Sequence, residues 1–350
     1  MNSLSSNKPP NSQQFVDALG RPLRDLRISV TDRCNFRCPF CMPSDIFGET
    51  YHFVPRGEVL SFEEIVRLAR IFVKLGVHKI RLTGGEPLLR NRLELLVPQL
   101  VAIEGIDDVA LTTNGFLLAE KAGALKDAGL RRVTVSLHSL NDEVFAKMNG
   151  QGYSTKRVLD GIQKAAEVGI TPIKINVVVQ RGVNDHTTVE LARYFKSLGH
   201  TVRFIEYMDV GNLNGWRMEH VVPADEIVKM IDAELPLEPI ERNYNSEVAL
   251  RYRYKDGGGE IGIIASVTKP FCGDCSRIRL SAEGKIYTCL FATIGHDIRA
   301  PLRSGASDEE IEELLTKIWT PRTDRYSELR TAETPLESKR KKVEMFQVGG

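Results

Sequence analysis

The chain has 350 residues, 42% of them hydrophobic, which is enough for two domains or for one barrel with an appendage. Its formal net charge is +1, so no overall field favours nucleic acid or an anionic membrane, and an anionic substrate needs a local basic pocket. No segment approaches the roughly 20 apolar residues of a membrane span. We therefore expect a cytoplasmic protein without nucleic-acid or membrane partners, whose polar residues 1–14 form a flexible tail.

A repeated pattern of helix and strand extends from about residue 25 to about residue 210. The helix that begins after Ser61 has a capping box with Glu64, and glycines that follow the helix ends precede the strands. This alternation predicts right-handed βαβ units and a parallel sheet. Six strands are expected, at residues 26–31, 79–83, 108–113, 131–137, 172–179 and 201–208. They favour an α/β fold in which residues 15–234 form a partial (β/α)6, TIM-like barrel, with an open doubly wound sheet as the alternative.

Several of these strands alternate polar and apolar residues, although buried parallel strands are usually apolar throughout. Lys174 and Asn176, for example, lie opposite Ile173 and Ile175. If the apolar faces meet the helices, the polar faces line a lumen that is filled by a ligand. Edge strands with one solvated face are the alternative, but we expect the lumen because the pattern recurs on several strands.

The sequence changes character after about residue 235. Two β-hairpins are expected there, one over residues 248–267 around a glycine-rich turn and one over residues 277–290. A helix is expected at residues 308–319. We therefore predict that residues 235–350 form a C-terminal, β-containing extension of the barrel.

The six cysteines fall into two groups of three. Disulfides are rare in the cytoplasm, so these cysteines indicate metal binding or catalysis. The groups are Cys34, Cys38 and Cys41, after the first strand, and Cys272, Cys275 and Cys289, around the second hairpin. Cysteine thiolates hold iron–sulfur clusters, usually four to a cluster, so three thiolates leave one iron of a four-iron cube open. Zinc with a fourth ligand is the alternative, and it is the more serious rival at the second group, where two cysteines are spaced as in a zinc knuckle.

Two motifs carry a resemblance to a known family. The segment from Cys34 to Cys41 resembles the CxxxCxxC signature of the radical S-adenosylmethionine (SAM) superfamily, and the Thr-Gly-Gly-Glu-Pro run at 83–87 resembles the element that meets SAM. Residues 24–33, residues 276–280 and the second cysteine group extend the similarity to the GTP 3′,8-cyclase family, over about residues 20–350. The resemblance implies a barrel of the radical SAM type, in which each cysteine group holds a 4Fe-4S cluster and SAM is the cofactor.

The resemblance also implies an activity and its site. Enzymes of this family are lyases that convert GTP to (8S)-3′,8-cyclo-7,8-dihydroguanosine 5′-triphosphate, the first step of molybdenum cofactor (molybdopterin) biosynthesis. A radical formed from SAM removes a hydrogen from C3′ of GTP, and the C3′ radical attacks C8 of guanine, so no side chain is implied as catalytic. SAM contacts are implied at Phe40, Gly85, Ser136 and Met208. GTP contacts are implied at Arg27, Arg81, Thr112, Lys174, Arg277, Ile278 and Arg279, of which Arg277 and Arg279 are candidates for positioning the substrate.

Ordinary structural roles compete with these assignments. Met208 fits core packing, and each strand-borne arginine or lysine could pair with a neighbouring carboxylate. Gly349-Gly350 resembles the mobile tail of the family, which reaches toward the active site, but a disordered end is the usual interpretation of such a sequence. For the whole chain, the alternatives are another two-cluster radical SAM enzyme such as a peptide-modifying maturase, and a zinc-containing nucleic-acid-binding module, which the near-neutral charge disfavours.

The resemblance finally implies partners. GTP is the expected substrate, and the product is expected to pass to cyclic pyranopterin monophosphate synthase. An electron donor is required for the reductive cleavage of SAM. We expect a monomer or a homodimer.

Overall fold

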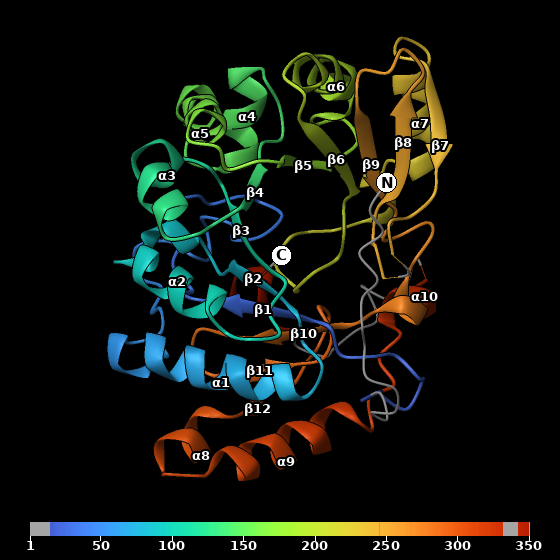
Figure 1. Ribbon diagram of the computed structural model, residues 1–350. Helices are drawn as coiled ribbons and strands as arrows, with labels where there is room; N and C mark the ends of the chain where they lie inside the picture. Colours follow the sequence, from blue (N-terminus) through green and yellow to red (C-terminus); the bar gives the residue numbers. More distant parts are fainter. Residues whose placement is uncertain (1–14, 245, 332–341, 350) are drawn as a thin grey trace, which may run out of the picture.

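A curved sheet forms the centre of the computed structural model, which describes residues 15–244, 246–331 and 342–349 (Figure 1). Six parallel strands lie side by side in chain order. They are β1 (Asp25–Ser29), β2 (Lys79–Thr83), β3 (Asp108–Thr113), β4 (Arg132–Ser136), β5 (Ile173–Val179) and β6 (Thr201–Glu206). A doubly wound sheet would reverse its strand order partway, so the sequential order confirms the partial barrel. The predicted tail at 1–14 lies outside the described residues.

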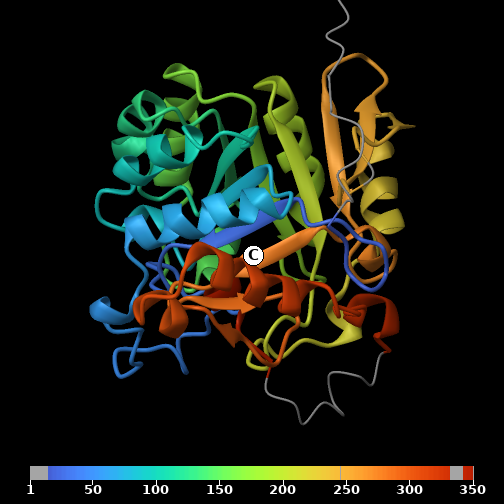
Figure 2. The same cartoon turned by 60° about the horizontal axis from the view of Figure 1, so that its bottom comes forward.

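Helices cover the outer, convex face of these strands (Figures 1 and 2). They are α1 (Phe62–Lys74), α2 (Leu96–Val101), α3 (Leu118–Asp127), α4 (Asp142–Asn149), α5 (Lys156–Glu167) and α6 (Thr188–Ser197). The predicted capping box of α1 is present, because Ser61 Oγ accepts from the Glu64 amide and the Glu64 carboxylate accepts from the Ser61 amide. Short 3-10 helices lie at Arg56–Glu58, Pro87–Leu89, Leu93–Leu95, Asp185–Thr187, Met218–His220 and Cys272–Asp274.

The C-terminal part of the chain extends the sheet at both of its edges. Strands β7 (Leu237–Ile240), β8 (Leu250–Tyr254) and β9 (Glu260–Ile264) join one edge, and β9 pairs with β6 in parallel. Strands β10 (Arg277–Leu280), β11 (Lys285–Tyr287) and β12 (His296–Asp297) join the other, and β10 pairs with β1 in parallel. Both predicted hairpins are confirmed, but they continue one twelve-stranded sheet. The division between residues 234 and 235 stays a prediction.

The remaining helices of the described residues follow β6 in the sequence. They are α7 (Ala224–Asp232), α8 (Arg299–Arg303), α9 (Asp308–Trp319), α10 (Tyr326–Leu329) and α12 (Met345–Val348). Helix α9 coincides with the helix predicted at 308–319 and contacts α1, and α12 contacts β1. In the part of the chain that the structure describes, no helix is long and apolar enough to cross a membrane.

The alternation along the strands separates a core from a lumen. Ile173, Ile175 and Val177 of β5 are fully buried in the main hydrophobic core. Lys174 and Asn176, on the opposite face of the same strand, line the cavities inside the curve of the sheet. The predicted polar lumen is therefore confirmed, and it positions the site.

Candidate active site

A cavity of about 280 Å³ at the carboxyl ends of the strands brings the two cysteine groups together. All six cysteines line it, although the groups are far apart in the sequence: Cys34, Cys38, Cys41, Cys272, Cys275 and Cys289. Strand β10 pairs with β1 in parallel, so Cys272 and Cys275 precede the amino end of this strand pair, whereas the first group follows its carboxyl end. The two groups therefore line the cavity from opposite ends of two neighbouring strands. All six thiols are free of disulfides and are partly buried.

Backbone and arginine contacts shape the loop that carries the first group. The Cys38 carbonyl accepts hydrogen bonds from the amides of Cys41 (2.9 Å) and Met42 (2.8 Å), which turns the chain between these two cysteines. Arg37 braces the loop, since its guanidinium donates to the Cys34 carbonyl at 2.7 Å and to the Phe47 carbonyl at 2.7 Å. The loop is therefore held in place by the protein's own contacts.

Cys275 differs in acidity from Cys34 of the first group and from Cys289 of its own group, whose pKa burial raises to about 11. Burial, followed by the negative charge of Glu86, raises the pKa of Cys34 to about 12. Although burial alone would raise the pKa of Cys275, the guanidiniums of Arg277 and Arg322 bring it down to about 6. Metal ligation requires the thiolate, so the first group needs the charge of a bound metal to ionise, whereas Cys275 is already stabilised as a thiolate.

The donor chemistry of both groups fits an iron–sulfur cluster. Each group offers three thiols at one cavity, and amides donate to sulfur at both, from Phe36 to Cys34 Sγ and from Phe291 to Cys289 Sγ, each at 3.4 Å. Arg277 Nη2 also donates to Cys275 Sγ at 3.4 Å. Hydrogen bonds to sulfur are among the features that tune such clusters. Among the described residues, no group of three or more His, Cys, Asp or Glu side chains is arranged to hold a single metal ion.

The glycines of the run at 83–87 allow two loops to pack closely. A Cβ at Gly84 would overlap the Thr31 carbonyl oxygen, and a Cβ at Gly85 would lie 2.6 Å from the Arg33 carbonyl carbon. The Gly85 amide donates to the Thr31 carbonyl at 2.9 Å. These glycines therefore allow the backbone of the first cysteine loop to approach, while Gly85 also lines the cavity as predicted for a SAM contact.

Glu86 of the same run has a structural role. Its buried carboxylate accepts hydrogen bonds from Thr113 Oγ1 (2.7 Å), the Asn114 amide (2.7 Å) and the Leu88 amide (2.9 Å). Burial raises its pKa to about 7. The side chain thus ties the loop after β2 to the end of β3.

The four predicted SAM residues share the cavity with the first cysteine group: Phe40, Gly85, Ser136 and Met208. His138 also lines this cavity, and its ring meets Phe40 edge-on at a centroid distance of 5.1 Å. Burial lowers the pKa of His138 to about 4, and its Nδ1 accepts from the Val178 amide at 3.2 Å. The imidazole is therefore neutral, with its proton on Nε2. His138 continues the polar face of β4, in agreement with the alternation of residues 132–138.

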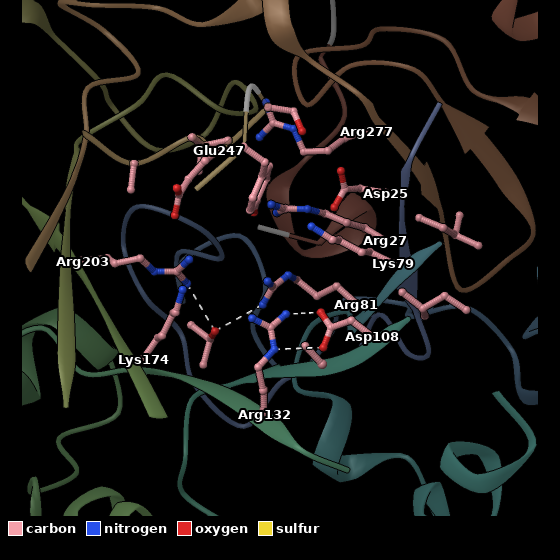
Figure 3. Close-up of a pocket in the computed structure, with 18 of the residues that line it drawn as sticks. Asp25, Arg27, Lys79, Arg81, Asp108, Arg132, Lys174, Arg203, Glu247 and Arg277 are labelled. Carbon is pink, nitrogen blue, oxygen red and sulfur yellow. Dashed lines mark hydrogen bonds and ion pairs between the residues drawn. The ribbon is translucent and has the colours of Figure 1, made fainter. Parts of the chain in front are cut away.

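A second cavity, of about 90 Å³, lies at the amino ends of the strands (Figure 3). Its charged lining consists mainly of cations: Arg27, Lys79, Arg81, Arg132, Lys174, Arg203 and Arg277, with Asp25, Asp108 and Glu247. Four arginines line both cavities, so the two spaces adjoin: Arg27, Arg81, Arg203 and Arg277. The register places Arg279, Arg27 and Arg81 side by side on β10, β1 and β2. We call this smaller space the cationic chamber.

Among the described residues, the cations of the chamber that were predicted to bind GTP form no ion pair with a carboxylate. Arg132 pairs with Asp108, but the ion pairs of the described residues include none of Arg27, Arg81 and Lys174. Arg81 instead donates to the Thr112 hydroxyl at 3.0 Å, which joins two predicted GTP contacts. Buried cations without counter-charges favour an anionic ligand, so the arrangement argues against the salt-bridge alternative.

Mutual repulsion adds to burial in this chamber. Burial and then the neighbouring guanidiniums of Arg279 and Arg277 lower the pKa of Arg27 well below its usual value. Burial and the charge of Arg203 lower the pKa of Lys174 to about 8. A bound polyanion would relieve both effects, because an opposite charge stabilises the protonated forms.

The structure places the other predicted GTP residues at different points of the lumen. Thr112 and Arg279 line the larger cavity, whereas Lys174 lines the chamber alone. The side chain of Ile278 is fully buried in the hydrophobic core, so only its backbone can reach a ligand. Sequence reasoning missed Arg203, which alternates with apolar Val202 and Phe204 in the same way as Lys174 does with its neighbours.

The C-terminal tail reaches this site. Arg279 Nη1 donates to the Val348 carbonyl at 3.0 Å and to the Gly349 carbonyl. Gly349 has a φ of 70° and lies against Thr83, so a Cβ there would overlap Thr83 Cγ2 and lie 3.0 Å from its hydroxyl. Gly350 lies outside the described residues. The described part of the tail thus takes the position expected from the resemblance.

Comparisons with known proteins agree with this geometry. The family model of the radical SAM superfamily matches residues 28–195, and the "Molybdenum Cofactor Synthesis C" model matches residues 200–328. A GTP 3′,8-cyclase of Acidothermus cellulolyticus is 55% identical over 92% of this chain and 90% of its own length. A GTP 3′,8-cyclase of Staphylococcus aureus (strain JH9) is 48% identical over 97% of this chain and 99% of its own.

Solved structures of lower identity share the fold. The crystal structure of Streptococcus suis SuiB bound to S-adenosylmethionine matches with a TM-score of 0.58 at 13% identity, over 83% of this chain and 67% of that chain. SuiB bound to the precursor peptide SuiA matches with a TM-score of 0.54 at 12% identity, over 91% of this chain and 65% of that chain. These likenesses confirm the radical SAM fold, and the full-length relatives place the chain more narrowly. The chain belongs to the GTP 3′,8-cyclase family of the radical SAM superfamily.

Proposed function

We propose that this chain is a lyase that converts GTP to (8S)-3′,8-cyclo-7,8-dihydroguanosine 5′-triphosphate, the first step of molybdenum cofactor biosynthesis. The observation that carries the proposal is the cationic chamber, four of whose arginines also line the cavity of the two cysteine groups. A nucleotide can therefore place its triphosphate at the amino ends of the strands and its base toward the cysteines. The names of the relatives agree with this substrate.

Two 4Fe-4S clusters are assigned to the two cysteine groups. Cys34, Cys38 and Cys41 would hold the cluster at which SAM binds, since Phe40 lies within the same loop and Gly85 packs against Arg33, which precedes Cys34. Cys272, Cys275 and Cys289 would hold the second cluster, on the side of the base. When bound, the first cluster and SAM supply the radical that begins the reaction, and the protein binds and orients the reactants.

The protein's own side chains would fix the nucleotide between these clusters. Arg27, Arg81 and Lys174 are assigned to the triphosphate, and Lys79 and Arg203 extend the same lining. Two unit charges 4 Å apart attract by about 4 kcal/mol at an effective dielectric of roughly 20, so a few such pairs suffice for tight binding. Arg277, beside Cys275, and Arg279, held by the tail, are assigned to orienting the ribose and base.

Partners and setting complete the proposal. The enzyme would act in the cytoplasm as a monomer or homodimer and take electrons from a separate donor. Its product would pass to cyclic pyranopterin monophosphate synthase. Residues 15–234 would act as the barrel and residues 235–350 as the region of the second cluster.

Anaerobic reconstitution tests this proposal. The protein is loaded with iron and sulfide and then given SAM, a reductant and GTP. We expect 5′-deoxyadenosine in amounts that depend on GTP, together with cyclised nucleotide. Equal deoxyadenosine without GTP, and no cyclised nucleotide, would refute the assignment.

Matched cysteine variants separate the two clusters. Replacing Cys34, Cys38 and Cys41 by serine should abolish SAM cleavage. Replacing Cys272, Cys275 and Cys289 by serine should remove about half of the bound iron, because the first group still holds one cluster. The same replacement should abolish cyclisation, because the cluster on the side of the base is lost. Cyclisation that survives the second replacement would contradict the two-cluster assignment.

A further inference from the structure

A buried charged cluster ties the C-terminal tail to the loop that follows β6. Lys342 Nζ donates to Asp209 Oδ2 at 2.9 Å, to the Asp209 carbonyl at 3.0 Å and to the Tyr326 hydroxyl at 2.7 Å. Arg330 Nε lies 2.9 Å from Asp209 Oδ1, and the Tyr326 hydroxyl donates to Asp209 Oδ2. We call Asp209, Tyr326, Arg330 and Lys342 the tail latch.

The latch is sealed from water. The side chains of Asp209, Arg330 and Lys342 are 2%, 1% and 3% exposed. Phe291 stacks on Tyr326 at a centroid distance of 4.4 Å, and the Lys342 ammonium lies 4.7 Å from the centre of the Tyr326 ring. Buried charges are held only where partners and geometry compensate for the lost hydration. Asp209 satisfies this condition for two cations, so the ammonium of Lys342 is tightly fixed.

The position of the latch connects parts of the site that are distant in sequence. Asp209 directly follows Met208, which lines the larger cavity, and Phe291 lies two residues after Cys289. Lys342 opens the described tail. Its charged group is buried in an ion pair.

The tail between Lys342 and Gly349 then crosses to the first cysteine loop. The Val343 amide donates to the Ala292 carbonyl at 3.0 Å, and Glu344 accepts from the Asn212 amide at 3.0 Å. The ring of Phe346 meets that of Phe47 at 4.9 Å, in a cluster against which Cys34 and Cys41 pack. The tail ends at Arg279, whose guanidinium it holds through two carbonyls.

We propose that Lys342 is a positioning residue, whose ion pair with Asp209 fixes residues 343–349 in the site. The latch holds Phe346 over the first cysteine loop and holds the Val348 and Gly349 carbonyls at Arg279. Arg279 is thereby kept in one orientation. Long side chains lose entropy when they are ordered, so an arginine that the tail already orders loses less entropy when a ligand binds. The effect on turnover rests on the proposed function, whereas the effect on the tail does not.

The variant Lys342→Met tests the latch. Methionine keeps a long unbranched side chain, and Arg330 still neutralises Asp209, so no buried charge is left alone. The readout is hydrogen–deuterium exchange of the cluster-loaded protein. We expect the amides of Gln347 and Gly349, which are hydrogen-bonded within α12, to exchange faster by on the order of tenfold or more, with β5 unchanged.

A matched variant controls for the substitution itself. Lys317 forms an exposed ion pair with Glu313 at 2.8 Å on α9. Lys317→Met should leave tail exchange and turnover at wild-type levels, because exposed pairs contribute little. Lys342→Gln, which can still hydrogen-bond to Asp209, should give an intermediate exchange rate and provides a second variant if the methionine protein folds poorly.

Turnover is measured on the same samples. For Lys342→Met we expect unchanged iron content and a GTP-dependent turnover (kcat) lowered on the order of tenfold. Tail exchange that stays at the wild-type rate would overturn the latch. A loosened tail with undiminished turnover would overturn the positioning role. If the wild-type protein itself formed no cyclised nucleotide, the proposed function would fail, while the exchange comparison would still decide the latch.

Discussion

Replacing Gly85 by alanine should separate two loops that meet in the site. The φ of Gly85 is not in the left-handed region, so the conflict is one of space alone. The new Cβ would overlap the Arg33 carbonyl oxygen and lie 2.9 Å from the Asp32 carbonyl oxygen, and backbone atoms cannot swing aside. The loops must move apart, which breaks the hydrogen bonds from the Gly85 amide to Thr31 (2.9 Å) and from the Glu86 amide to Arg33 (2.8 Å).

The size of the effect follows from these contacts. Overpacking costs about 1–3 kcal/mol, and each lost hydrogen bond adds about 0.5–1.5 kcal/mol. The free energy of unfolding should therefore fall by about 2–6 kcal/mol. With a urea slope of about 3 kcal/mol/M, the midpoint of unfolding falls by roughly 1–2 M.

The assay is anaerobic urea unfolding of the cluster-free chain, followed by circular dichroism, with iron content measured after reconstitution. Gly123→Ala is the matched control, because Gly123 lies inside α3 and nothing lies within 4 Å of its Cβ position. That variant should gain about 0.5–1 kcal/mol from helix propensity. A Gly85→Ala protein that unfolds at the wild-type urea concentration and binds full iron would refute the steric argument.

Three further predictions concern charge and the tail. Lys174 has a pKa of about 8, so GTP affinity measured by calorimetry should fall as the pH rises through 8, and Lys174→Met should flatten that dependence. Gly349→Ala should lower cyclisation without changing iron content, and Thr83→Ser in the same chain, which removes the overlapping methyl, should recover part of it. The pKa of Glu86 is raised to about 7, so this residue lowers stability as the pH rises from about 4.5 to 7. In Glu86→Gln, unfolding curves should no longer show this pH-dependent loss of stability. At neutral pH the variant should nevertheless be about 1–3 kcal/mol less stable, because the glutamine NH2 group then faces the backbone N–H of Leu88 or Asn114, where the carboxylate accepted a hydrogen bond.

Local signals in the sequence were sufficient for the barrel. Period-two alternation and glycines past the helix ends located all six strands, and the capping box at Ser61 marked the start of α1. The polar faces identified the lumen, and the same rule applied to β6 would have added Arg203. These features depend on neighbouring residues, which is why sequence alone reveals them.

Contacts between distant segments were not predictable in this way. Nothing near Arg277 indicates that β10 pairs with β1, so the second hairpin was expected in an appendage rather than in the sheet. Ile278 alternates with two cavity-lining arginines, yet its side chain belongs to the core on the other face of β10. The buried pair of Asp209 and Lys342 also depends on tertiary folding, because its partners come from the loop after β6 and from the tail.

The pairing of β10 with β1 also bears on synthesis at the ribosome. Ser276 and Asp25, which are hydrogen-bonded at this edge, are 251 residues apart. At about 5–20 residues per second, roughly 13–50 s pass between their translation. During that time the first strand of the nascent barrel has one open edge, which is a template for pairing with other chains. Cells that make this protein thus have reason to shield the emerging chain until its last third has left the exit tunnel.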